Sequence, residues 1–138
     1  MAAPMMSNED YSLIKSFLII PVVLSVFERD SQIIGKFAML KTPDPYVDVI
    51  QSGMQRATTV LAEVRRELRN HGIKVYEVVR TAKGIEAKYQ CRGYHSEFSM
   101  LWSLVQADVS VRMRAYMGLD ISEFVRHDLD EHEREIIH

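Results

Sequence analysis

The sequence predicts an α+β domain that is mostly helical: a bent apolar N-terminal helix, two long antiparallel helices connected by a β-hairpin, and a short acidic C-terminal tail. Apolar residues recur every three or four positions over 44–70 and again over 96–117, and between these ranges the period changes to two. The length of 138 residues and the 47% hydrophobic content are typical of one compact domain. We place this domain at 7–119 and the tail at 120–138.

The first helix is expected to begin at Ser7, whose hydroxyl can accept a hydrogen bond from a backbone N–H three residues on, and the acidic residues after it favour a helix start. Apolar residues at alternating spacings of four and three continue it through 17–27, the stretch FLIIPVVLSVF. Pro21 should bend this helix or restart it, because proline lacks the N–H that the helix interior needs. The many β-branched residues leave a buried strand open as an alternative.

This apolar stretch is too short for a membrane span, because its 11 residues stop at Glu28 while a bilayer needs about 20. It is apolar on nearly all sides, so we expect the domain or a second subunit to enclose it, which favours a homo-oligomer without a membrane. The single cysteine, Cys91, excludes an intrachain disulfide and is typical of a packing residue in a reducing compartment. We therefore expect a cytoplasmic protein.

A short helix is predicted over 31–40, and the prolines that follow end it. The most regular element follows over 44–70, where Asp44 can cap the helix and Pro45 suits its first position. Gly72 suits the residue after its end. One apolar stripe runs along this helix without interruption: Val47, Ile50, Met54, Ala57, Leu61, Val64 and Leu68.

Residues 73–80 and 85–92 alternate with a period of two and flank a turn at 81–84, which predicts a β-hairpin. Gly93 should break the second strand, and Ser96 should open a second long helix that ends at Gly118. The tail carries seven acidic residues from Asp120 onward and a short apolar stripe that would let it dock as a last helix.

Charged residues lie on the apolar face of the helix predicted over 96–117. At 100° per residue, Asp108 and Arg112 fall at the centre of this face and Glu97 near its edge. The spacing of four lets Asp108 and Arg112 pair. One interpretation is a structural ion pair that sets the register between helices or subunits. The other is a small-ligand sensor or an enzyme with an interhelical pocket at these residues.

The middle of the chain is basic: residues 56–92 carry nine basic and four acidic side chains, while 93–138 carry four and nine. Arginine forks match phosphate oxygens, so this segment makes a nucleic-acid-binding protein the alternative function. Interleaved glutamates and a whole-chain pI of about 6.2 favour an ordinary solvated face instead. The candidate residues for a protein partner or a polyanion are Arg65, Arg66, Arg69, Lys74, Arg80, Lys83, Lys88 and Arg92.

No catalytic residue, cofactor or metal site is assigned from the sequence. His127 and His132, each four residues from an acidic residue, match no established zinc spacing. We therefore expect a non-enzymatic, homo-oligomeric binding or regulatory protein. The apolar helix would serve self-association, and the hairpin or a helix face would bind a protein partner.

Overall fold

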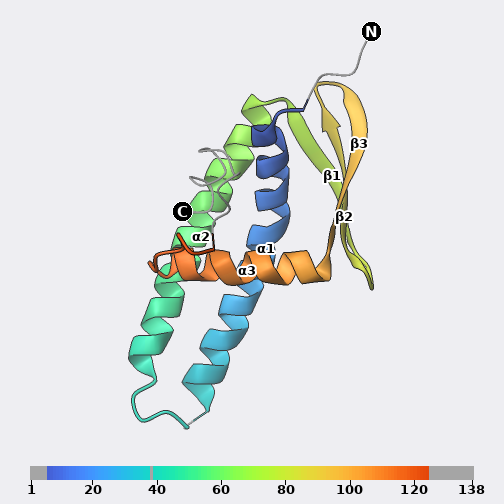
Figure 1. The fold of residues 1–138 in the computed structure, drawn as a ribbon. Coiled ribbons are helices and arrows are strands. Elements are labelled where there is room, and N and C mark those ends of the chain that lie inside the picture. The colour runs from blue at the N-terminus through green and yellow to red at the C-terminus, as the bar shows by residue number, and fades with distance from the viewer. Residues whose placement is uncertain (1–5, 38, 125–138) are drawn as a thin grey trace.

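The structure is a computed structural model that describes residues 6–37 and 39–124. Within these ranges it contains three helices and one antiparallel sheet, so the predicted mostly helical α+β fold class is confirmed. Figure 1 shows α1 and α2 running antiparallel, with α3 lying across both and the sheet to one side. The elements are α1 (Asn8–Lys36), α2 (Asp44–Asn70), β1 (Ile73–Arg80), β2 (Gly84–Cys91), β3 (Tyr94–Leu101) and α3 (Trp102–Tyr116).

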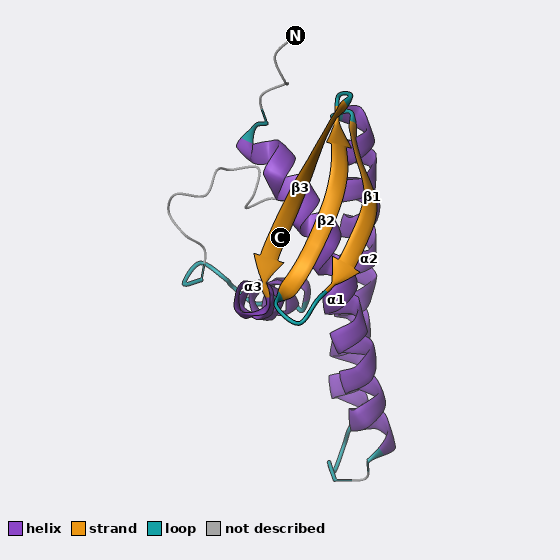
Figure 2. Cartoon of the chain, turned by 90° about the vertical axis from the view of Figure 1, so that its right-hand side faces the viewer, coloured by secondary structure: helices purple, strands orange, loops and turns teal. Residues whose placement is uncertain are grey.

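α1 begins where the sequence predicts. The Ser7 hydroxyl accepts from the Asp10 N–H at 3.1 Å, and the Asp10 carboxylate accepts from the Ser7 N–H at 3.0 Å, which together form a capping box. The helix stays continuous through Pro21, which lies on its exposed side. The helix axis changes direction near its crossing with α3, in line with the predicted bend (Figures 1 and 2).

The separate short helix predicted over 31–40 is wrong, because α1 continues to Lys36. Ser31 donates to the carbonyl of Glu28, and Gln32 bonds the Glu28 carboxylate, so helical contacts span the expected break. The expected break between the two helices fell near residues 29–31. These residues include no proline or glycine, so nothing there interrupts the backbone hydrogen bonds of α1. The helix ends instead at Phe37, whose backbone is extended.

Most of the apolar stretch 17–27 is buried or half-buried within this one chain, with Pro21 and Ser25 exposed. α1 packs against α2 and α3 and touches β1, and the buried side chains on it include Leu18, Ile19, Val23 and Phe27. By length and composition alone α1 could also cross a membrane, and 56% of its most apolar stretch is buried inside the protein. The predicted cytoplasmic location and the predicted absence of a membrane therefore stay predictions.

α2 starts at Asp44, with Pro43 as the N-cap and Pro45 in the first turn, one residue from the predicted cap. Its apolar stripe faces α1, and five of the seven predicted stripe residues are buried. At Gly53 the three helices meet closely, because an added Cβ would lie 3.1 Å from the ring of Phe27 and 3.3 Å from Met117. Gly72, with a φ of 69°, follows the end of the helix as predicted.

The predicted hairpin is the pair β1–β2, and β3 adds a third strand that the sequence analysis misses. The helix predicted from Ser96 instead starts at Trp102, because Arg92 and Gly93 form a two-residue turn with φ values of 47° and 91°. Two consecutive positive φ values suit the right-handed twist of a hairpin. β3 then pairs with β2 from Cys91↔Tyr94 to Gly84↔Leu101.

One face of the sheet packs on the helices and the other faces outward, as Figure 2 shows. Ile85, Ala87, Tyr89 and Cys91 alternate along β2 and are buried, whereas the residues between them are exposed or half-buried. Burial raises the pKa of the Cys91 thiol, so this cysteine is a packing residue as predicted.

α3 follows β3 directly, and it is anchored to the sheet at its first residue. The Trp102 indole N–H donates to the Thr81 carbonyl at 2.7 Å, and its backbone N–H donates to the Lys83 carbonyl. After α3, Ile121 is fully buried against Ala115, and residues 119–124 form irregular chain and a turn rather than a helix. The rest of the predicted tail lies outside the described residues.

Candidate interaction surfaces and polar sites

The predicted pair on α3 is present and Arg112 is buried. Arg112 Nε donates to Asp108 Oδ2 at 3.3 Å, and the exposed fraction of the Arg112 side chain is 2%. Its two terminal nitrogens donate to the Tyr116 hydroxyl at 3.4 Å and to the Ser16 hydroxyl on α1 at 3.0 Å. Burial raises the pKa of Tyr116, with the positive charge of Arg112 opposing that effect. All three Arg112 nitrogens are thus used: two bond side chains of α3 itself, and the third joins α3 to α1 through Ser16.

Glu97 does not join this pair. It lies on β3 rather than on α3, is exposed, and sits opposite Lys88 in the β2–β3 register. This corrects the predicted grouping of Glu97 with Arg112, because the 100° spacing that suggested it applies only to a helix. The geometry favours the structural interpretation of Asp108 and Arg112. The guanidinium of Arg112 donates its hydrogen bonds to side chains of α3 and α1 rather than presenting them to a pocket.

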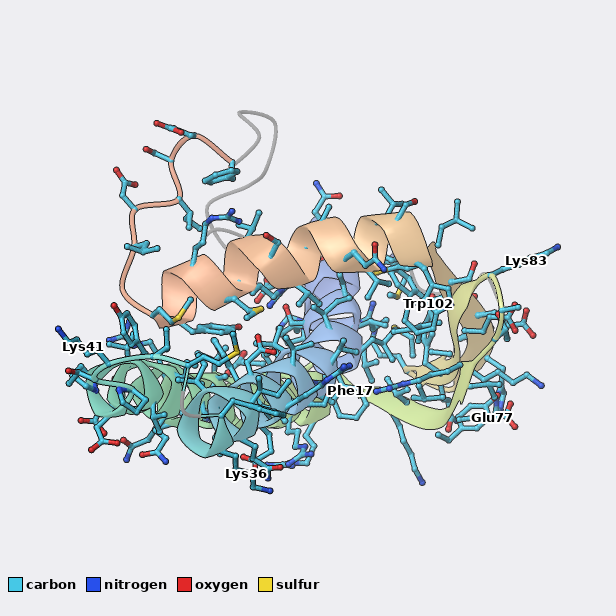
Figure 3. The ribbon with its side chains drawn as sticks, turned by 90° about the horizontal axis from the view of Figure 1, so that it is seen from below. Phe17, Lys36, Lys41, Glu77, Lys83 and Trp102 are labelled. Atoms are coloured by element: carbon cyan, nitrogen blue, oxygen red, sulfur yellow. The ribbon has the colours of Figure 1, made fainter. Side chains whose placement is uncertain are left out.

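The eight predicted basic residues do not form one surface. Arg65, Arg66 and Arg69 are exposed on α2, whereas Lys83 projects outward at the far end of the hairpin (Figure 3). Lys88 pairs with Glu77 at 3.3 Å, and this hydrogen bond raises the pKa of Lys88. Lys74 and Arg80 are exposed at opposite ends of β1. Glu77, Lys88 and Glu97 form one row across the outer face of the sheet, so Lys88 has a negative neighbour on each side. Nucleic-acid binding by the segment 56–92 stays a prediction.

Arg92 belongs to a polar cluster that the sequence analysis does not predict, which we call the polar corner: Glu9, Asp10, Glu67, His71 and Arg92. It joins the first turn of α1, the last turn of α2 with its C-cap, and the β2–β3 turn. Asp10 is buried, and its carboxylate bonds His71 Nδ1 at 2.7 Å and Arg92 at 3.2 Å. Arg92 also donates to the His71 carbonyl at 2.9 Å. Three distant segments are therefore tied at one point.

The other ring nitrogen of His71 faces two carboxylates. Its Nε2 lies 3.2 Å from Glu9 Oε1 and 3.7 Å from Glu67 Oε2. One ligand atom from each of these three residues lies within 4.8 Å of the others, which is a spacing that a metal ion could bridge. Burial alone would raise the pKa of Asp10, but bonds from the Ser7 backbone, His71 and Arg92 outweigh it and hold that pKa below its usual value. Asp10 is therefore an ionised hydrogen-bond acceptor.

A local signal for this corner exists in the sequence. Glu67 and His71 are four residues apart at the end of a regular helix, a spacing that puts both side chains on one face. Glu9 and Asp10 were interpreted only as helix-start residues. Their proximity to His71 depends on the antiparallel packing of α1 on α2, which brings residues 61 positions apart within hydrogen-bonding distance.

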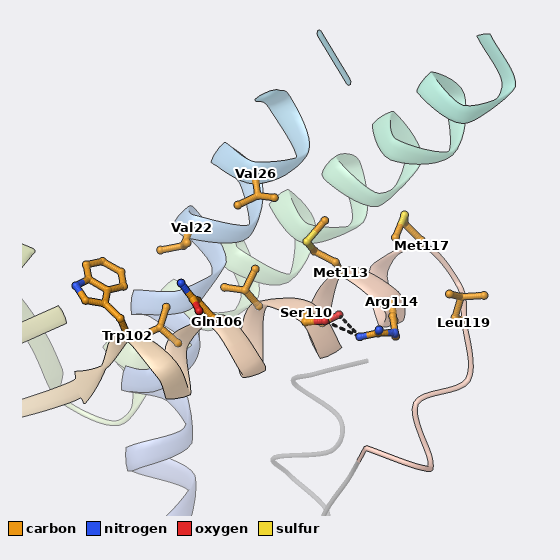
Figure 4. Close-up of a pocket in the computed structure, with 11 residues that line it drawn as sticks. Val22, Val26, Trp102, Gln106, Ser110, Met113, Arg114, Met117 and Leu119 are labelled. Atoms are coloured by element: carbon orange, nitrogen blue, oxygen red, sulfur yellow. Dashed lines mark hydrogen bonds between the residues drawn. The ribbon is translucent and has the colours of Figure 1, made fainter. Parts of the chain in front are cut away.

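An apolar hollow of about 590 Å³ lies between α1 and α3. Figure 4 shows Val22 and Val26 of α1 on one side and Trp102, Met113 and Met117 on the other. The polar groups at its edge are Gln106, Ser110 and Arg114, and the Arg114 guanidinium donates to both the hydroxyl and the carbonyl of Ser110. Arg112 is not among the lining residues.

A second apolar surface lies on the ends of α1 and α2 that extend past α3, as Figure 1 shows. We call residues 28–37 and 39–52 the distal arm. Among its described residues only Ile50 is a buried apolar side chain. Six large apolar side chains are exposed there: Ile33, Phe37, Met39, Leu40, Tyr46 and Val49.

The fold and these surfaces define a small α+β protein whose polar corner and apolar arm lie at opposite ends of its helical pair. A family model described as YhjD protein matches residues 5–121, so the chain belongs to the YhjD family. It is 28% identical over 114 residues to the protein named "Uncharacterized protein YhjD" from Bacillus subtilis (strain 168). The aligned region covers 83% of this chain and 94% of that relative. No solved structure matches the chain.

Proposed function

We propose that the protein is a non-enzymatic, homo-oligomeric binding protein in which the distal arm of one copy packs against the distal arm of a second. The observation that supports this proposal is the exposure of Phe37, Met39 and Tyr46, which are 59%, 88% and 58% exposed. Exposed apolar patches of this kind mark interaction surfaces in proteins. The stretch 17–27, which suggested self-association, is already enclosed, so the surface shifts to the exposed continuation of the same helix.

The size of the arm suits a second copy. Phe37 and Tyr46, each more than half exposed, together present on the order of 200 Å² of surface, since one aromatic side chain offers about 150–250 Å². Ile33, Met39, Leu40 and Val49 add aliphatic surface to this. A standard interface buries about 800 Å² on each partner, so these side chains would form the apolar centre of a two-fold contact that polar residues surround.

The shape and charge of the arm also suit a second copy. The arm is an antiparallel pair of helix ends, and two such pairs can bury their apolar faces against each other as a four-helix bundle. Its charged residues are three basic and four acidic, namely Glu28, Arg29, Asp30, Lys36, Lys41, Asp44 and Asp48. This near balance removes the repulsion that would oppose contact between two identical surfaces.

The test is the molar mass of the full-length protein in solution, measured by light scattering after gel filtration. We expect a dimer that becomes a monomer in the double variant Phe37→Lys with Tyr46→Lys. The matched control is Leu104→Lys on α3, because Leu104 is 57% exposed but lies outside the arm. Circular dichroism must show that all variants keep the helical content of the parent.

A monomeric parent protein at about 100 μM would overturn the proposal, since an interface of this size should give a dissociation constant well below that concentration. A dimer that survives both arm substitutions and dissociates with Leu104→Lys would also overturn it. In that case the exposed face of α3 would carry the association.

A further inference from the structure

The polar corner has a feature that neither its helix caps nor its ion pairs account for. His71 presents one ring nitrogen to a buried carboxylate and the other to two half-exposed carboxylates. We propose that Glu9, Glu67 and His71 Nε2 bind a divalent transition-metal ion, with Zn²⁺ as the best fit, and that the ion clamps the start of α1 to the end of α2. Self-association through the distal arm is not needed for this site.

The hydrogen bond between His71 and Asp10 supplies the first argument. A carboxylate oxygen accepts, so the 2.7 Å contact places a proton on His71 Nδ1. In a neutral ring the lone pair of Nε2 then points toward the oxygens of Glu9 and Glu67, at 3.2 and 3.7 Å. A metal ion among these three acceptors would remove their mutual repulsion.

The distances suit a metal ion. Two ligands bound about 2.0–2.1 Å from zinc in tetrahedral geometry lie about 3.3–3.4 Å from each other. The separations of Nε2 from the two carboxylate oxygens, 3.2 and 3.7 Å, lie on either side of that value, and all three ligand atoms lie within 4.8 Å of one another.

The surroundings also match those of metal-binding histidines. Such residues almost always donate their second N–H to a carboxylate, which fixes the ring and makes the ligand more basic. Asp10 has this role here: its side chain is 3% exposed and is held by the Ser7 backbone and by Arg92. The carboxylates of Glu9 and Glu67 lie beside the ring, and two carboxylates at one point favour a divalent cation there.

The donor set selects the class of ion. One imidazole nitrogen with two carboxylate oxygens suits zinc and neighbouring transition metals, whereas Mg²⁺ and Ca²⁺ prefer sites made of oxygen alone. The side chains of His71, Glu9 and Glu67 are 22%, 37% and 38% exposed, so an ion can enter from solvent. Water would complete the coordination as a fourth ligand.

The experiment is calorimetric titration of untagged, chelator-treated, full-length protein with Zn²⁺, with Mg²⁺ as a comparison, and a parallel measurement of the melting temperature. We expect one zinc per chain, a raised melting temperature and no response to Mg²⁺. Glu9→Gln and Glu67→Gln should each weaken zinc binding by about tenfold or more, and Asp10→Asn by about 10–100-fold. Glu63→Gln, an exposed position one turn before Glu67 on α2, should leave binding unchanged.

Three results would overturn the proposal. The first is a zinc affinity that none of the corner variants changes. The second is loss of zinc binding in the double variant His127→Ala with His132→Ala but not in the corner variants. The third is the absence of zinc binding by the parent protein.

Discussion

Replacing Arg112 with leucine should lower the free energy of unfolding by about 3–5 kcal/mol, the loss found when one partner of a buried ion pair is removed. Leucine keeps part of the apolar stem but leaves the Asp108 carboxylate and the buried hydroxyls of Ser16 and Tyr116 without the guanidinium. At about 4 °C per kcal/mol for a chain of this size, the melting temperature should fall by roughly 12–20 °C. Urea unfolding followed by circular dichroism measures the loss directly.

The double variant Asp108→Leu with Arg112→Leu separates the ion pair from packing. Removing both charges leaves no unpaired buried carboxylate, so the double variant should lose less stability than the two single losses added together, with a coupling of about 1–3 kcal/mol. Arg112→Lys retains a charge but not the planar fork, and it keeps the test informative if the leucine variant fails to fold. Arg65→Leu, on the exposed side of α2, should change stability by less than about 0.5 kcal/mol.

A loss below about 1 kcal/mol in Arg112→Leu would refute the reasoning, because it would mean that the buried guanidinium contributes no more than an exposed ion pair. Strict additivity of the two single variants would refute it equally. The two side chains would then lie close together without a coupling free energy between them.

Three further predictions concern pH and glycines. The lowered pKa of Asp10 contributes stability that is present above its unfolded pKa and lost as the pH falls through its folded pKa. In Asp10→Asn the free energy of unfolding should therefore fall less steeply as the pH is lowered into the acid range. Gly84→Ala should cost about 3 kcal/mol or more in urea unfolding, because its Cβ would overlap the Met100 carbonyl. Gly35→Ala, whose Cβ meets only Val47 at 3.9 Å, should stabilise by about 0.5 kcal/mol in the same assay.

The elements that could be predicted from the sequence are those that local patterns determine. α2 has an uninterrupted apolar stripe between a proline start and Gly72, and β1–β2 have a period of two around a glycine turn, so each is recognisable alone. The burial of Arg112 also follows from local geometry, because a helical wheel places it at the centre of the apolar face. These predictions require no knowledge of which elements are neighbours.

β3 was missed because two patterns overlap. Phe98 and Met100 are partly buried and Glu97 and Ser99 exposed, which is strand-like alternation, yet Leu101, Leu104 and Val105 extend the helical spacing of α3 back into the same region. The Arg92–Gly93 turn is the signal that decides between them, since two residues with positive φ return the chain beside β2. Gly93 was interpreted as the end of the sheet instead of the turn into its third strand.

The polar corner could not be predicted for a different reason: its residues acquire their chemistry from tertiary contacts. Glu9 and Asp10 are ordinary residues for the first turn of a helix, and Arg92 is an ordinary turn residue. Only the antiparallel packing of α1 on α2 brings His71 to Asp10, and only the third strand creates the turn that carries Arg92. A single sequence contains the residues of the site but not their juxtaposition.

The corner and the distal arm lie at opposite ends of α1, a helix of 29 residues, and therefore about 27–40 Å apart at 1.5 Å per residue. The effects of substitutions so far apart, without shared partners, usually add. Between the two ends, Arg112 and the core residues of α1 hold the helices in one packed arrangement. Metal binding at the corner should thus stabilise the fold without changing the dimer, so the failure of either proposal leaves the other untouched.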